Sequence, residues 1–323
     1  KNKIHIDGQL VGELKGLKFD IEVTPKTLDT DIKSIKKAAR KGVEKELIKR
    51  VDEILAQGKI DIDQESKIVW KNYPIARLKK GNDYLNPEIE IIADDSLDEN
   101  SKSKLIAYLN KWLSKYKNDL LGDLIKLTKY KISNQYLRGL LFQLYENNGV
   151  IKRESIEKIV KLIPAEERKK LWGMGIKIGR YHIYLPKMLK PKAVEFRINL
   201  WKIFHNLSNY NEIPKSGLNF LSNVKVEKDF LLLCGFEKFR DFFVRIDILE
   251  KLFLKIIENT KDKRFKVNSE MMNLLGCSKE NFYKLMTYMN YKKDKVIDTY
   301  IFRGERKKKK KIIQFDKKEN PFN

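Results

Sequence analysis

The spacing of apolar residues changes near Ser96, and this change constrains the fold more than any other feature of the chain. Before it, from His5 to Val23 and again from Lys59 to Asp94, apolar and polar residues alternate between turn-forming glycines. Such alternation is typical of half-buried antiparallel strands. After it, apolar residues recur about every 3.6 residues, as in amphipathic helices. The sequence therefore predicts an α+β protein in which a small antiparallel β unit precedes a mostly helical region.

A long helix interrupts the β-rich first part of the sequence. Asp29 and Thr30 can cap this helix, and apolar residues recur at helical spacing until Gly58. Hairpin strands and one further strand are predicted between residues 59 and 94. We therefore expect residues 1–94 to form a compact unit of a small antiparallel sheet and a long helix.

Residues 95–210 are predicted to form a mostly helical domain with one short β segment. Leu105, Leu109 and Leu113 share one face of its first helix, and a further helix is predicted from about Asn134 to Asn147. The period of the apolar residues indicates that these helices pack on a common core.

The last predicted domain, residues 243–323, follows a connecting segment of residues 211–242. Its predicted elements occur in the order of a winged helix: helix, strand, helix, turn, helix and hairpin. Ser278 is expected to cap the third helix. The β-prone runs KVIDTYIF and KKIIQF are predicted to form the hairpin, or wing, with the basic sequence RGERKKK between them.

The net charge of the chain points to a polyanionic partner. The 68 lysines and arginines outnumber the 44 acidic residues, which gives a formal charge of +24. Such a field attracts nucleic acid or anionic membranes. No apolar run reaches the roughly 20 residues of a membrane span, so nucleic acid is favoured over a membrane. The two cysteines lack the spacing of a zinc site and fit the reducing cytosol, which favours a cytoplasmic location.

One basic segment stands out within this charge. Residues 168–194 contain eight lysines and arginines and no acid, and they also contain Trp172, Tyr181, His182 and Tyr184. Phosphates attract cations, and exposed rings stack on unpaired bases, so the segment predicts a site for single-stranded nucleic acid. A second interpretation, compatible with the first, is a core strand, IKIGRYHIYLP, whose polar residues face water.

The candidate nucleic-acid contacts come from two parts of the chain. In the middle they are Lys177, Arg180, Tyr181, Lys187 and Lys190, and at the wing they are Arg303, Arg306, Lys307, Lys308 and Lys309. Lysines act as point charges on phosphates and read no base, so backbone contacts should dominate. We expect the two groups to converge into one track for an unpaired strand.

The sequence lacks the motifs of a catalytic site. It has no G-x-x-x-x-G-K-[ST] loop, no Asp-Glu box for magnesium, and no HExxH or G-x-S-x-G motif. We therefore predict no catalytic residue, no metal ligand and no cofactor in this chain, and no ATPase activity of the chain alone. A nuclease that uses Asp20, Glu22, Glu88 or Glu90 is a weaker alternative, because no paired lysine accompanies these carboxylates.

Several motifs, in order along the chain, resemble one helicase family. They are DGQLVGELKGLKF, IKKAARKGVEKELIKR, IVWKNYPIARLKKG, LRGLLFQLYENNGVIKRESI, LWGMGIKIGRYHIYLPKMLKPKAVEFRINLW, RIDILEKL and MMNLLGCSKENFYKLMTYMNY. Together they resemble the region after the motor domains in alphaproteobacterial superfamily-two helicases of the DExH type that are similar to the mitochondrial degradosome RNA helicase. The resemblance implies two upstream RecA-like lobes, absent from this sequence, that bind ATP and magnesium, hydrolyse ATP and translocate along RNA or DNA.

The resemblance and the charge together predict the C-terminal accessory region of an ATP-dependent helicase, which guides single-stranded nucleic acid. The sequence begins at Lys1 without a methionine, from which we infer a fragment. Two alternatives stay open. One is a standalone winged-helix regulator that reads a duplex through Lys279, Asn281, Tyr283 and Lys284. The other is a scaffold that docks a nuclease or ribosomal partner through Trp201 and Phe204.

Overall fold

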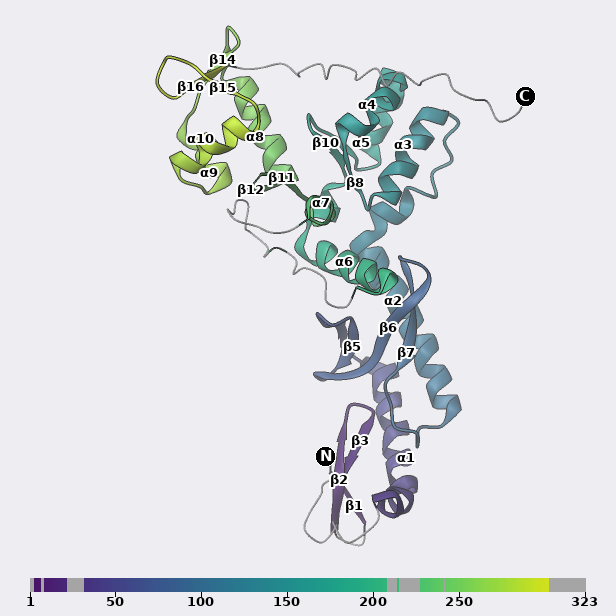
Figure 1. The fold of residues 1–323 in the computed structure, drawn as a ribbon. Helices are drawn as coiled ribbons and strands as arrows, with labels where there is room; N and C mark the ends of the chain where they lie inside the picture. Colours follow the sequence, from purple (N-terminus) through teal and green to yellow (C-terminus); the bar gives the residue numbers. More distant parts are fainter. Residues whose placement is uncertain are drawn as a thin grey trace, which may run out of the picture. The chain divides into compact units, whose positions relative to one another are not determined.

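The computed structural model describes residues 3–6, 9–21, 32–207, 214, 227–240 and 242–301. Helices and small antiparallel sheets alternate along these residues, which confirms the predicted α+β class (Figure 1). The described residues as far as Glu237 form one compact unit, and those from Lys238 onward form a second. Every helix in the described ranges is too short or too polar to traverse a lipid bilayer.

The first unit begins with a three-stranded meander beside a long helix. The strands β1 (Lys3–Ile6), β2 (Gln9–Lys15) and β3 (Lys18–Ile21) pair in sequence order, and α1 (Ile32–Gln57) contacts β1 and β3. Arg50 of α1 is buried and donates hydrogen bonds to the carbonyl oxygens of Leu14 (3.1 Å) and Gly16 (2.6 Å). The predicted meander and helix are confirmed, and Arg50 joins them at the β2–β3 turn.

A four-stranded antiparallel sheet follows the long helix. Its strands pair in sequence order and are β4 (Ile60–Ile62), β5 (Lys67–Trp70), β6 (Tyr73–Asp83) and β7 (Asn86–Ile91). Ile68 of β5 lies opposite Ala76 of β6, and both are buried with Leu78, two residues further along, as apolar residues on the core face of a hairpin should be. The predicted hairpin strands are confirmed.

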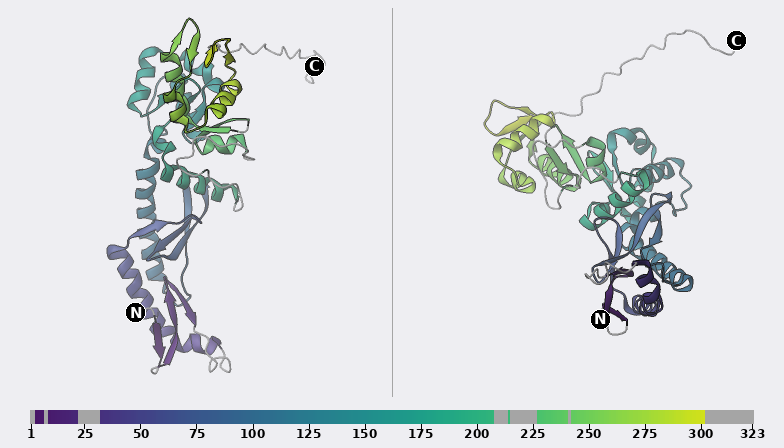
Figure 2. Two further views of the ribbon diagram at one scale, coloured as in Figure 1. Left: turned by 90° about the vertical axis from the view of Figure 1, so that its left-hand side faces the viewer. Right: turned by 60° about the horizontal axis from the view of Figure 1, so that its bottom comes forward.

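Helices dominate the rest of the first unit. They are α2 (Glu99–Lys126), α3 (Gln135–Glu146), α4 (Arg153–Leu162), α5 (Ala165–Gly173), α6 (Pro191–His205) and α7 (Lys228–Leu233). The Asp98 side chain accepts a hydrogen bond from the Ser101 amide (2.8 Å) and caps α2, which contacts α1 and β7 and also α6 (Figures 1 and 2). Buried side chains from β2 through α6 form a single hydrophobic cluster, so sheets and helices share one core.

The basic segment forms a hairpin instead of the expected single strand. The strands β8 (Val150–Lys152), β9 (Lys177–Ile178) and β10 (His182–Tyr184) make a sheet in the order β8-β10-β9, and the short 3-10 helix η2 (Pro186–Leu189) follows. The Gly179 amide donates to the His182 carbonyl oxygen (2.8 Å) and closes the turn between β9 and β10. The prediction that IKIGRYHIYLP forms one core strand was therefore wrong, because the chain reverses after Gly179.

A buried arginine joins the segments around this hairpin. Arg197 of α6 is fully buried and donates hydrogen bonds to the carbonyl oxygens of Asn148, Met188 (3.3 Å) and Leu233 (2.8 Å). Burial lowers the pKa of Arg197 to about 10, because it penalises the charged form. The guanidinium thus links α6 to the α3–β8 turn, to η2 and to α7.

The second unit has the predicted element order, that of a winged helix. Its elements are the end of β11 (Phe236–Phe239), β12 (Phe242–Arg245), α8 (Ile246–Glu258), β13 (Thr260–Lys261), β14 (Arg264–Lys266), α9 (Ser269–Leu275), α10 (Lys279–Tyr288), β15 (Lys292–Lys293) and β16 (Thr299–Ile301). Four of the strands form a sheet in the order β13-β14-β16-β15. The Ser278 side chain accepts a hydrogen bond from the Asn281 amide (3.3 Å), which confirms the predicted cap of α10.

A short hairpin, whose turn is termed the wing turn, lies earlier in the sequence than the predicted wing. It consists of β15 and β16, and its turn is formed by residues 294–298. The Asp294 amide donates to the Thr299 carbonyl oxygen (2.8 Å), and Asp298 adopts a φ of +59°, a left-handed conformation that aspartate tolerates. KVIDTYIF therefore does not form one strand, because its first half belongs to the turn. The KKIIQF run lies outside the described residues.

Candidate nucleic-acid interface

The basic segment of residues 168–194 has a fixed backbone. It comprises most of α5, the hairpin of β9 and β10, η2 and the first residues of α6. Gly175, with a φ of +77°, turns the chain between α5 and β9, and its amide donates to the Trp172 carbonyl oxygen (3.0 Å). Because helices and paired strands carry the segment, its cations project from defined positions.

The four rings of the basic segment differ strongly in exposure. Trp172 is 78% exposed and Tyr181 is half-buried, whereas Tyr184 and His182 are only 5% and 1% exposed. A buried ring offers no face to a base, so Trp172 is the ring best placed for stacking. Sequence reasoning noted Trp172 in the segment but did not include it among the candidate contacts, because exposure cannot be read from a tryptophan in a short helix.

Three of the four predicted basic contacts in this segment are exposed, and two of these three, Lys177 and Lys190, have no ion-pair partner among the described residues. Lys177 lies on β9, opposite Tyr184 of β10, and Lys190 immediately precedes α6. Both side chains are exposed to solvent. These two lysines are therefore available to phosphate groups.

The other two predicted basic contacts lie beside carboxylates. Lys187 is exposed, but its Nζ lies 3.1 Å from Asp123. Arg180 is half-buried, and its charge lowers the pKa of Glu157, although a hydrogen bond from Lys161 has the larger effect. Sequence reasoning could not foresee these carboxylates, since both come from other helices.

Asp123, near the end of α2, lies close to two parts of the basic segment. Besides its contact with Lys187 of η2, it lies close to the α5–β9 turn, where a Cβ built on Gly175 would be 3.4 Å from Oδ2. Trp172 and Lys177 flank Gly175 closely in sequence. The structure therefore brings Lys187 and the α5–β9 turn, which lies between Trp172 and Lys177 in the sequence, to the same end of α2.

A second acid-free stretch begins directly after Asp123, and sequence reasoning missed it. Between Leu124 and Tyr145 the chain has no acidic residue and four basic ones. The basic residues are all exposed: Lys126, Lys129, Lys131 and Arg138. Exposed rings lie among them: Tyr130 (37%), Tyr136 (36%) and Phe142 (58%). The signal, cations and rings without acids, was present in the sequence and is the same as in the basic segment.

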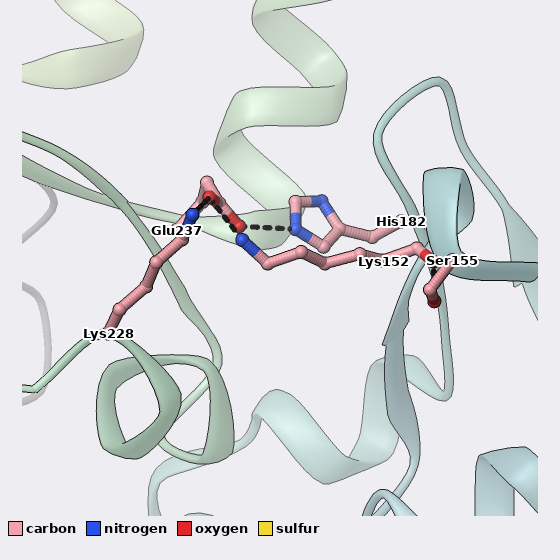
Figure 3. A network of polar contacts seen from close by, with 5 residues as sticks. All are labelled: Lys152, Ser155, His182, Lys228 and Glu237. Carbon is pink, nitrogen blue, oxygen red and sulfur yellow. Dashed lines mark hydrogen bonds and ion pairs between the residues drawn. The ribbon is translucent and has the colours of Figure 1, made fainter. Parts of the chain in front are cut away.

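A buried carboxylate holds the hairpin of the basic segment to its neighbours (Figure 3). Glu237 Oε2 lies 2.9 Å from His182 Nε2, and Glu237 Oε1 lies 2.6 Å from Lys152 Nζ and 4.0 Å from Lys228 Nζ. Burial raises the pKa of Glu237, but hydrogen bonds from His182 and Lys152 lower it by more. Burial lowers the pKa of Lys152, and the hydrogen bond to Glu237 offsets part of this decrease. This network joins β8, β10, α7 and β11, so its role is to position the hairpin.

The predicted wing contacts cannot be placed beside the basic segment. Arg303, Arg306, Lys307, Lys308 and Lys309 lie outside the described residues. The expected convergence of the two groups on one track therefore stays a prediction.

Three of the four side chains that a duplex-reading α10 would use have partners within the second unit. Lys279 Nζ donates to Asp298 Oδ2 (2.7 Å), and the Tyr283 hydroxyl donates to Asp298 Oδ1. Lys284 forms an ion pair with Glu280 (2.8 Å). A duplex would have to displace these acids before α10 could read its bases.

The residues of the scaffold interpretation contact their own unit. The Trp201 ring lies 5.0 Å from His205 and 6.2 Å from Phe230, between ring centroids, and Lys80 Nζ lies 5.0 Å from the centre of the Phe204 ring. Both rings are half-buried, so neither offers a largely exposed apolar surface to a partner.

The carboxylates of the nuclease interpretation are likewise not assembled. Asp20 pairs with Lys15 (3.1 Å), Glu90 pairs with Arg77 and Lys79, and Glu22 lies outside the described residues. Within the described ranges, no three His, Cys, Asp or Glu side chains are grouped so that they could hold a metal ion.

Comparisons with known proteins yield no relative. The chain matches no protein-family model, no curated protein and no solved structure. Its resemblance to the helicase family therefore stays a prediction.

Proposed function

We propose that this chain is the C-terminal accessory region of an ATP-dependent RNA or DNA helicase, in which it binds and guides single-stranded nucleic acid. In this proposal, upstream RecA-like lobes of the same polypeptide bind ATP and magnesium and carry out the hydrolysis. The chain contributes no catalytic group. It holds the emerging strand in the cytoplasm, where a nuclease is a further partner.

The exposure of Trp172 is the observation that carries this proposal. A tryptophan that is 78% exposed removes little apolar surface from water, so folding alone gives little reason for its position. It lies in a segment with eight basic residues and no acid. Stacking of one base on an aromatic ring contributes about 1–3 kcal/mol, and it tolerates every base.

Charges around this ring favour contacts with the nucleic-acid backbone. Lys177 and Lys190 are exposed, and the stretch after Asp123 adds the exposed Lys126 and Lys129, which exposed rings follow in the sequence. Lysines contact phosphates as point charges without reading sequence. This arrangement supports binding of an unpaired strand with little sequence preference.

The two alternatives have less support. A regulator that reads a duplex needs side chains on α10 that instead pair with Asp298 and Glu280. A docking scaffold needs Trp201 and Phe204, whose rings contact residues of their own unit.

Substitution of Trp172 tests the proposal. We expect Trp172→Ala to weaken the binding of a short, fluorescently labelled oligouridylate by roughly tenfold or more, because one stacked base contributes about 1–3 kcal/mol. Fluorescence anisotropy measures this affinity. In the wild-type chain, the oligonucleotide should also quench part of the tryptophan emission, and this part should be missing in Trp172→Ala.

Two control variants make the result specific. Trp172→Phe keeps an aromatic face and should retain most of the affinity, whereas Leu254→Ala removes another apolar side chain of high exposure, on α8, and should change nothing. Equal affinities of Trp172→Ala and the wild-type chain would rule out the stacking role.

A further inference from the structure

The four-stranded sheet of the second unit has two faces of different character. In its register, Lys261 of β13 lies opposite Arg264 of β14, Arg264 lies opposite Ile301 of β16, and Ile301 lies opposite Lys292 of β15. Directly opposed residues of antiparallel strands point to the same side of a sheet. These side chains therefore form one row across all four strands.

The core of the unit identifies the direction in which this row points. Phe265 follows Arg264 on β14, and Tyr300 precedes Ile301 on β16. These two residues lie opposite each other, are each 1% exposed, and stack their rings with centroids 5.9 Å apart. Successive residues of a strand point to opposite faces. The row with Lys261, Arg264 and Lys292 therefore lies on the outer face, turned away from the core.

Four basic residues occupy this outer face. Lys266 joins the row of three, because it lies two residues beyond Arg264 on β14 and opposite Thr299. All four side chains are exposed: Lys261, Arg264, Lys266 and Lys292. Since neighbouring strands are about 4.8 Å apart, the row extends over roughly 14 Å from β13 to β15.

Nearby acids neutralise only part of this charge. Asp294 pairs with Arg264 (3.0 Å), and Asp262 is exposed in the β13–β14 turn. Asp298 is bound by Lys279 and by Tyr283, although the charge of Lys266 also acts on it. Among the described residues, Lys261, Lys266 and Lys292 have no ion-pair partner within 4.0 Å.

We propose that this outer face binds the phosphate backbone of nucleic acid without reading its bases. The inference goes beyond the proposed function, because it adds a second surface, in the other unit, for the same class of ligand. Its cations form a line that a chain of phosphates complements in charge. Among the described residues, the face carries no aromatic ring for stacking and only the half-buried Ile301 as an apolar group, so base contacts and membrane insertion are both disfavoured.

A triple substitution on the full chain tests this surface. We expect Lys261→Gln, Lys266→Gln and Lys292→Gln together to weaken oligonucleotide binding and to reduce the slope of log affinity against log salt by about two. This figure follows from three lost phosphate contacts at about 0.7 each on a single strand. Glutamine keeps most of the side-chain volume, so the fold should persist, which circular dichroism checks.

A matched triple removes the same charge elsewhere in the unit. Lys251→Gln, Lys255→Gln and Lys284→Gln lie on α8 and α10, away from the sheet face. We expect this control to leave the salt slope nearly unchanged. If it lowers the slope as much as the sheet triple does, the effect comes from net charge alone and the proposed surface is wrong.

The quenching of Trp172 separates this inference from the proposed function. If the sheet triple lowers the slope and the quenching persists at saturation, both surfaces bind. If the slope is unchanged and quenching persists, the sheet surface fails and the stacking site stands. If the sheet triple lowers the salt slope but the wild-type chain shows no quenching, the stacking site is wrong and the sheet surface stands. Binding of vesicles with phosphatidylserine that the sheet triple abolishes, with oligonucleotide binding unaffected, would overturn the inference in favour of a membrane.

Discussion

At the residue scale, Glu237 is a single carboxylate that faces three basic side chains. Its partners are His182, Lys152 and Lys228, and its side chain is only 13% exposed. Its pKa is lowered because the hydrogen bonds from His182 and Lys152 outweigh the effect of burial. Removal of the charge would leave two lysines close together without a counter-ion, which is costly in a partly buried site.

The lowered pKa of Glu237 predicts a pH-dependent loss of stability. A carboxyl whose pKa is lower in the folded than in the unfolded state stabilises the fold above its unfolded value of about 4.3, and this contribution is lost as the pH falls through the folded value. We therefore expect Glu237→Gln to cost about 2 kcal/mol at pH 7 and progressively less below about pH 4. Urea unfolding monitored by tryptophan fluorescence measures this loss of stability. The signal reports on the first unit, because all four tryptophans, Trp70, Trp112, Trp172 and Trp201, belong to it.

An exposed carboxylate serves as the control for this substitution. Glu157 forms an i, i+4 ion pair with Lys161 (2.7 Å) on the surface of α4, so Glu157→Gln should change stability far less than Glu237→Gln. Equal losses in the two variants, or a loss in Glu237→Gln that is the same at pH 3 and pH 7, would contradict the role of the buried network.

Buried arginines mark a limit of sequence reasoning at this scale. Nothing in the local sequence distinguishes Arg197, which is fully buried, from Arg168, which is exposed. Arg197 can be buried because carbonyl oxygens from three separate segments accept hydrogen bonds from it, and only the tertiary fold brings these segments together. The exposure of Trp172 escaped prediction for the same reason.

At the element scale, the wing turn and α10 are held together by one aspartate. Asp298 accepts hydrogen bonds from Lys279 and from the Tyr283 hydroxyl, and these bonds lower its pKa. The bonds place a carboxylate against the exposed side of the helix that a regulator would insert into a groove. The aspartate therefore blocks the α10 side chains that would be closest to the bases.

Asp298→Ala should release these α10 side chains. We expect duplex affinity to rise equally for all sequences, with a salt slope steeper by about one, because Lys279 gains access to one phosphate. Anisotropy titrations with several duplexes measure both quantities. Glu270→Ala removes one exposed acid from α9 and is the matched control. A strong preference of Asp298→Ala for one duplex sequence would instead support the regulator.

Elements with strong local signals were predicted well. The helix expected from Asn134 to Asn147 is α3, and the Asn134 side chain caps it through the amides of Tyr136 (2.9 Å) and Leu137 (3.1 Å). The errors concern turns. Gly179 and Asp298 each reverse the chain inside a β-prone run. The Gly179 amide bonds to His182 across its turn, whereas the Asp298 carbonyl oxygen accepts from the Val267 amide after β14, and apolar periodicity reveals neither bond.

At the scale of the whole molecule, charge is the property that the sequence predicts most directly. A net charge of +24 does not depend on the fold, whereas the distribution of that charge does. The structure shows exposed cations in both units, along the basic segment and on the outer sheet face, and the sequence reveals only the first of these groups. The residues of the sheet face could not be recognised, because they become neighbours only through strand pairing.

Salt should weaken nucleic-acid binding by the complete chain strongly. If roughly six to ten phosphates are contacted, affinity for an oligonucleotide should fall by about a thousandfold or more between roughly 50 and 200 mM salt, because bound counter-ions are released on association. Oligonucleotides of different sequence should behave alike. A flat salt dependence, or no binding to any polyanion, would leave the scaffold as the better interpretation.

The contact between Lys187 and Asp123 has a consequence for how a strand is held. A phosphate that approaches Lys187 competes with the carboxylate of Asp123, whose oxygens already lie 3.1 Å from the ammonium group. Binding there exchanges one anion for another, and the carboxylate returns when the phosphate leaves. In a helicase, this competition would keep residence times short at that lysine and would let the polymer slide onward instead of being trapped.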